Sequence, residues 1–156
     1  MIAYEHRVID GLVEALGADR EDRFPIAHRV VDEVAAHIAA VTQVLLPALR
    51  DIVPGGAEMA NQAQGLLQEL RGALAALEQG YPGDPGFETA VESVAGLLRR
   101  HVPVEESEHL PALSAIIGGD AMADLGRVWS QIKDHIPGGL DAMPAADSNP
   151  RFRTGP

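Results

Sequence analysis

Apolar residues recur every three or four positions over most of residues 1–135, which is the spacing of one face of an α-helix. The pattern predicts four long amphipathic helices and a shorter fifth one, at about 1–16, 21–52, 57–79, 85–117 and 120–135. Glycine and proline separate these segments. Amphipathic helices joined by short breaks predict an all-α, up-down-up-down four-helix bundle with the fifth helix as an accessory.

The amino-acid composition of the chain changes after the fifth predicted helix. From Pro137 onward it is rich in proline, glycine and alanine, without helical spacing. We therefore expect one bundle domain at 1–135 and an irregular tail at 136–156. A single domain is also the usual outcome for a chain of 156 residues.

The composition of the chain limits which binding partners and which metal ligands we expect. The net charge of −11 argues against nucleic acid, which needs clustered Lys and Arg. No basic leader and no bilayer-length apolar run is seen, so we expect a cytoplasmic protein with no membrane partner. Because cysteine is absent, any metal must be bound by histidine and carboxylate.

The second and fourth predicted helices contain a repeat. His37 and His101 are each followed by eight residues and then by Leu-Pro-Ala-Leu, and the second copy stands 64 positions after the first. Proline removes a backbone donor and clashes with the preceding turn. We therefore expect a kink or a loosened turn at Pro47, and kinks at Pro103 and Pro111.

The repeat also places polar residues on apolar faces. On a helical wheel, His101 and Glu105 lie within an apolar stripe that also takes in Ala112. His37 lies near the centre of the matching stripe, but Val41 stands where the later copy has Glu105. Burying an unpaired carboxylate costs several kcal/mol at least, so Glu105 is expected to be protonated, hydrogen-bonded, ion-paired or bound to a metal.

If the first, second and fourth helices face one centre, four side chains meet there: His6, at the edge of its apolar face, with His37, His101 and Glu105. Imidazole and carboxylate suit non-haem iron, zinc or manganese. The alternative is a metal-free core in which the histidines hydrogen-bond to Glu105 or to backbone carbonyls. Asp10 is a weaker candidate for an extra oxygen ligand. Glu106 and three further histidines, His28, His109 and His135, are expected to be solvated. Trp129 is expected to cover the bundle.

The chain up to about residue 135 resembles the hemerythrin-like family, also called HHE cation-binding domains. The resemblance rests on Glu5-His6-Arg7, His37 with its Leu-Pro-Ala-Leu, Val53-Pro54-Gly55-Gly56, Asp84-Pro85-Gly86-Phe87, and His101-Val102 with Glu105-Glu106 before Leu110-Pro111. It implies a four-helix bundle that holds two bridged irons. Such proteins bind dioxygen, nitric oxide or peroxide, or serve in iron handling and sensing.

Carried over by position, the resemblance makes metal ligands of His6, His37, His101 and Glu105. Two further ligand positions fall on side chains that cannot bind metal: the helix-two glutamate on Val41 and the helix-three histidine on Leu67. The resemblance therefore implies a reduced, mononuclear non-haem iron site for a small diatomic ligand or peroxide.

Two other functions remain open at the level of sequence. A relative without any cofactor could serve as an interaction or structural module, with the histidines and Glu105 forming a hydrogen-bonded cluster. An enzyme or a haem binder could use the altered pocket, but nothing in the sequence identifies a substrate, and a non-enzymatic role is the leading expectation.

Overall fold

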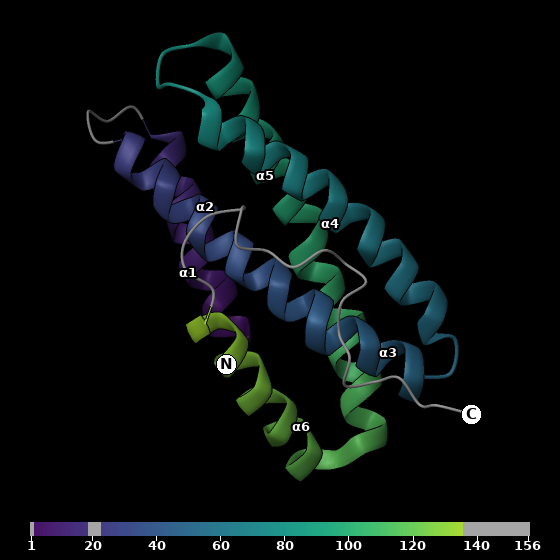
Figure 1. Cartoon of the computed structure of the whole chain (residues 1–156). Coiled ribbons are helices and arrows are strands. Elements are labelled where there is room, and N and C mark those ends of the chain that lie inside the picture. The colour runs from purple at the N-terminus through teal and green to yellow at the C-terminus, as the bar shows by residue number, and fades with distance from the viewer. Residues whose placement is uncertain (1, 19–22, 136–156) are drawn as a thin grey trace.

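The computed structural model describes residues 2–18 and 23–135, and all regular structure within them is helical (Figure 1). The elements in chain order are α1 (Ile2–Gly17), α2 (Arg23–Ala40), η1 (Val41–Leu45), α3 (Leu46–Ile52), α4 (Gly56–Gln79), α5 (Pro85–Val104), η2 (Glu105–His109) and α6 (Leu110–His135). The symbol η marks a π-helical turn, in which backbone hydrogen bonds join residues five apart.

These elements form four long helical rods, which confirms the predicted all-α bundle. α2, η1 and α3 make one continuous rod, and α5, η2 and the first part of α6 make another. α4 packs against α3 and α5, and α1 packs against α2. α5 begins at Pro85, as predicted, and Asp84 is its N-cap residue. The predicted tail and the first residues of the second predicted helix lie outside the described residues.

Each copy of the repeat contains one π turn directly before its Leu-Pro-Ala-Leu. Leu46 donates its backbone N–H to the Val41 carbonyl, and Leu110 donates to the Glu105 carbonyl. The proline that follows in each copy has no N–H with which to close a regular α-helical turn. The loosened turn predicted at Pro47 is therefore confirmed, and Pro111 is accommodated in the same way. Pro103, in contrast, lies inside α5 without a break.

The π turn corrects the predicted exposure of one histidine. A π turn uses an extra residue for the same rotation, so a helical wheel drawn for a regular helix falls out of phase beyond Glu105. His109 is buried rather than at the surface, and Leu113 is buried while Ala112 is only half-buried. The first copy follows the same phase, because Leu45 and Leu49 are buried at the matching positions.

The core consists mainly of Leu, Val, Ile and Ala side chains, with Phe87 as the largest fully buried residue. Among the described residues, six ionisable or histidine side chains are also buried: Glu5, His6, His37, His101, Glu105 and His109. Such groups are rarely buried unless they are paired or bound to a metal. Their burial identifies these residues as the candidate functional site.

α6 bends sharply at Gly118, whose φ of 73° and ψ of 177° are not helical. The break predicted between residues 117 and 120 is therefore confirmed at Gly118, as is the shorter fifth helix. Residues 119–135, here called distal α6, turn away from the fourth rod and run back toward α1 (Figure 1). Trp129 in distal α6 is buried, so this segment covers part of the bundle.

The rod from Arg23 to Ile52 is long and apolar enough to cross a membrane if only length and composition are considered. However, 72% of its most apolar window is buried inside the bundle. That burial is typical of a core helix of a folded domain.

Candidate metal centre

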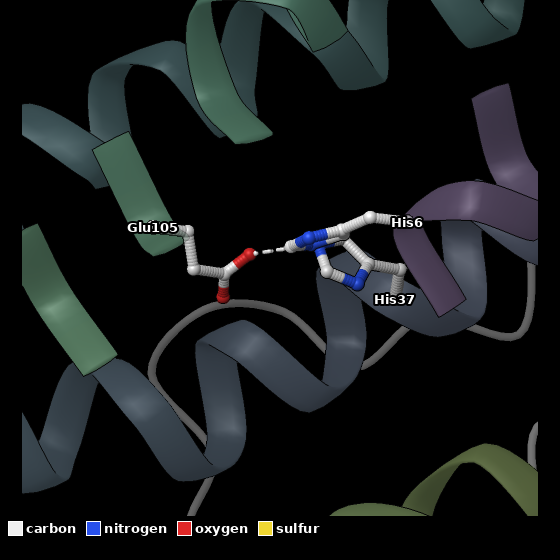
Figure 2. A group of neighbouring side chains, drawn as sticks. All are labelled: His6, His37 and Glu105. Atoms are coloured by element: carbon white, nitrogen blue, oxygen red, sulfur yellow. Dashed lines mark hydrogen bonds and ion pairs between the residues drawn. The ribbon is translucent and has the colours of Figure 1, made fainter. Parts of the chain in front are cut away.

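The four predicted site residues come from three rods and lie together. His6 is on α1, and His37 is near the end of α2. His101 is near the end of α5, and Glu105 is the first residue of η2. All four side chains are buried, including His6, which the sequence places only at the edge of its apolar face. Figure 2 shows the His6 and His37 imidazoles and the Glu105 carboxylate facing one another from their separate helices.

One oxygen atom is the centre of the cluster. Glu105 Oε2 lies 3.0 Å from His6 Nε2, 3.3 Å from His37 Nε2 and 3.2 Å from His101 Nε2. His37 Nε2 and His101 Nε2 are 3.1 Å apart. The Nε2 atoms of all three rings are therefore directed at the same small region of the core.

The repeat explains why the centre has two matching histidines but one acid. His37 and His101 occupy equivalent places, one turn before the π turn of each copy. Glu105 and Val41 are likewise equivalent, and both are fully buried. Only the second copy therefore contributes a carboxylate at this position of the repeat.

Charge interactions keep Glu105 and His37 ionised. Burial alone would raise the pKa of Glu105, but the charge of His37 and hydrogen bonds from the three histidines outweigh it and lower this pKa well below 4.5. Burial alone would lower the pKa of His37, but the Glu105 and Glu5 carboxylates outweigh it and raise this pKa to about 9. Without a bound cation, the centre therefore holds a carboxylate beside an imidazolium at neutral pH.

The outer ring nitrogens of two histidines also face carboxylates. His6 Nδ1 lies 2.7 Å from Glu106 Oε1, although the Glu106 side chain is 41% exposed. His37 Nδ1 faces Glu5 Oε1 at 3.8 Å. Glu106 is thus not merely a solvated neighbour, because it contacts a residue of the centre.

Glu5 is in turn held by distal α6. Trp129 Nε1 donates a hydrogen bond to Glu5 Oε2 at 2.9 Å, and Lys133 forms an ion pair with the other oxygen. Burial opposes ionisation of Glu5, but His37 and Lys133 together lower its pKa to about 2. The sequence gives Glu5 no role and expects Trp129 only to cover the bundle. The sequence feature that could have pointed to a role for Glu5 is its position directly before His6.

The donor set fits a small cation. Ligand atoms of His6, His37 and Glu105 all lie within 4.8 Å of one another. His101 lies outside that set, but its Nε2 adjoins both His37 and Glu105. Glu105 Oε1 is buried and has no hydrogen-bond partner, so one carboxylate oxygen is available to a ligand. Imidazole nitrogen and carboxylate oxygen suit divalent iron, zinc or manganese.

The same region offers no donors for a second ion at two positions where the resemblance implies them. Val41 and Leu67 are both 0% exposed and pack in the apolar core. Asp10, considered as a substitute oxygen ligand, is exposed on α1. These three positions therefore offer no ligand for a metal in the centre.

Three imidazoles and a carboxylate buried between the rods of a helical bundle define a protein of the cation-binding helical-bundle class. The family model described as hemerythrin HHE cation binding domain matches residues 1–113. The chain therefore belongs to the hemerythrin HHE cation-binding domain family, and this membership implies that it binds a cation.

A search of curated proteins and a search of solved structures each returned no match. The family match covers all four site residues and ends before the Gly118 break. Distal α6, with Trp129 and Lys133, lies beyond the matched residues.

Proposed function

We propose that this protein binds one non-haem iron ion through His6, His37, His101 and Glu105, and that it binds or senses dioxygen, nitric oxide or peroxide. The observation that carries the proposal is the convergence of three Nε2 atoms within 3.3 Å of Glu105 Oε2 in a buried site. An iron ion held there would supply a redox-active centre for such ligands.

The outer carboxylates support this use of the histidines. A histidine that binds a metal through Nε2 carries its ring proton on Nδ1 and usually donates it to a neighbouring group. Glu106 stands at Nδ1 of His6, and Glu5 faces Nδ1 of His37. Both carboxylates would fix the ring orientation and favour the tautomer whose Nε2 lone pair points into the site.

Metal analysis of protein purified from iron-supplemented culture tests the proposal. Wild-type protein is expected to carry one iron per chain, and His101→Ala to lose most of it. His28→Ala is the matched control, because His28 lies on α2 like His37 but is exposed. Equal iron content in the wild type and in His101→Ala would overturn the proposal.

A metal-free role is the second candidate, and one observation favours it. Glu105 Oε2 already has three imidazole partners, so the buried carboxylate is stabilised without a cation. The cluster would then be structural, and the chain would serve as an interaction module. Thermal unfolding distinguishes the two, because a ligand that binds only the folded state raises Tm. A chelator leaves Tm unchanged if the metal-free role is correct, whereas added ferrous ion raises it by several degrees if iron binds.

A further inference from the structure

A second feature of the bundle is a cavity of about 580 Å³ beneath distal α6. Its walls come from the start of α1, the end of η1, η2 with the first turn of α6, and distal α6. They are mostly apolar, and include Val44, Leu45, Leu113, Met122, Leu125 and Trp129. Protein interiors are close-packed, and cavities of roughly 300–1,000 Å³ are the size class of small-molecule sites.

The cavity is separate from the four site residues, none of which lines it. Distal α6 supplies its outer wall, including Met122, Leu125 and Trp129. Those residues follow the Gly118 break and lie beyond the family match. The cavity therefore depends on a part of this chain that the family match does not include.

The polar groups on the wall indicate which ligands would fit. Glu106 is the single charged residue among the lining residues, and Ser114 already donates its hydroxyl to the Pro111 carbonyl at 3.2 Å. The chain as a whole carries a net charge of −11. A carboxylate on an apolar wall in an acidic protein favours a cationic head group and disfavours an anionic one.

We propose that this cavity binds a small organic cation with an apolar body, such as an alkylamine or an arylalkylamine. The apolar body packs against Trp129 and the Leu and Met side chains, and the ammonium group pairs with Glu106 at the wall. Burial of the hydrocarbon part supplies most of the affinity, and the charge pair selects amines over carboxylic acids.

Two wall residues connect the cavity to the metal centre. Trp129 hydrogen-bonds to Glu5, which faces His37, and its ring also lies edge-on to the His37 ring with centroids 5.5 Å apart. Glu106 contacts His6. An amine in the cavity thus contacts the groups that orient two of the proposed metal ligands, and amine binding and iron binding affect each other reciprocally. This coupling, but not amine binding itself, rests on the proposed function.

Tryptophan fluorescence of the metal-free full-length chain tests the site, because Trp129 is the only tryptophan. The probe is n-hexylamine, with 1-hexanol and hexanoate as matched neutral and anionic controls. Hexylamine is expected to change the Trp129 emission with saturation, hexanol to bind more weakly, and hexanoate to have no saturable effect.

Two variants locate the binding. Ala123→Phe fills the cavity from an exposed wall position that should not disturb folding, and it should abolish the response to hexylamine. Glu106→Gln should weaken hexylamine about two- to fivefold, as expected for a partly exposed ion pair, and leave hexanol unchanged. Circular dichroism confirms that both variants remain folded.

Several results would overturn the inference. These are the absence of a saturable Trp129 response, hexanoate binding as tight as hexylamine binding, and an unchanged response in Ala123→Phe. An emission change that follows protein concentration rather than amine concentration would identify a second copy of the chain as the occupant, and it would also overturn the inference.

The coupling between amine binding and iron binding is tested in a separate experiment. If wild-type protein binds no iron, the proposed function fails while the fluorescence result stands. If iron binds, hexylamine should shift the iron affinity of the wild type but not that of Ala123→Phe.

Discussion

Val41 and Glu105 are the first residues of two equivalent π turns, and both side chains are fully buried. They differ only in that Glu105 places a carboxylate among three imidazoles, whereas Val41 packs in the apolar core. The equivalence provides a natural substitution for testing the centre, because the chain already accommodates valine at this position of the repeat.

Glu105→Val should abolish iron binding. The variant keeps all three histidines but removes the oxygen on which they converge. Loss of an outer carboxylate alone typically costs about 10- to 100-fold in metal affinity, so loss of a direct ligand should cost more than roughly 100-fold. Iron titration of the purified variants measures this, with Glu108→Val, an exposed glutamate on the same π turn, as the control. Wild-type affinity in Glu105→Val would contradict the assignment of this ligand.

The double variant Val41→Glu with Leu67→His should increase the metal content from one ion per chain to two. It restores donors at the two apolar positions where the family resemblance implies them. Burying two polar groups in the core should destabilise the metal-free protein by several kcal/mol, and added iron should reverse part of that loss. Elemental analysis and Tm with and without chelator measure both effects. A single iron per chain in a folded double variant would contradict the prediction.

Trp129→Phe should weaken iron binding about tenfold. Phenylalanine keeps the ring that packs beside His37 but removes the indole N–H that holds Glu5. Glu5 then orients His37 less firmly. The measurement is competitive titration of iron against a chelator, and Val128→Ala is the control because Val128 is exposed on the same helical segment. Unchanged affinity in Trp129→Phe would show that distal α6 does not influence the centre.

His109→Leu should stabilise the metal-free protein by about 1 kcal/mol. His109 is buried, its Nδ1 has no hydrogen-bond partner, and burial lowers the pKa of its imidazole. Leucine is already present at the equivalent position of the first copy, Leu45. Urea unfolding measures the difference. A loss of stability would contradict the prediction.

Stability of the metal-free protein should be greatest between about pH 4.5 and 6.5. The pKa of Glu5 is lowered from 4.5 to about 2, so its contribution is complete above pH 4.5 and is lost as the pH falls toward 2. The pKa of His37 is raised from 6.5 to about 9, so its contribution is complete below pH 6.5 and is lost as the pH rises toward 9. Thermal unfolding with chelator from pH 3 to 10 measures the profile.

A matched variant checks the alkaline side of this profile. His37→Gln removes the imidazolium and should flatten the decline in Tm between pH 6.5 and 9. An identical alkaline decline in the wild type and in this variant would assign the decline to other groups.

The fold could be predicted from the sequence because the features that determine where each helix begins and ends lie close together along the chain. Apolar spacing, the Pro54-Gly55-Gly56 break, Asp84-Pro85 and Gly118-Gly119 each act within one or two helical turns, and they define the rods. The convergence of His37, His101 and Glu105 was also predictable, because the repeat puts equivalent residues at equivalent heights in the bundle.

The remaining features depend on contacts or geometry that a helical wheel does not contain. The burial of His109 requires the π turn to shift the phase of the helix by one residue. The contact of Trp129 with Glu5 joins residues 124 positions apart and exists only because α6 bends at Gly118. Neither property follows from the spacing of apolar residues along the chain.

The left-handed backbone at Gly118 has an evolutionary consequence. An added Cβ would meet no atom within 4 Å there, so only the backbone conformation restricts this position to glycine. The segment beyond it covers part of a bundle whose proposed metal ligands all precede it. If the centre binds iron as proposed, mutations in distal α6 can change the iron affinity while all four proposed ligands stay the same.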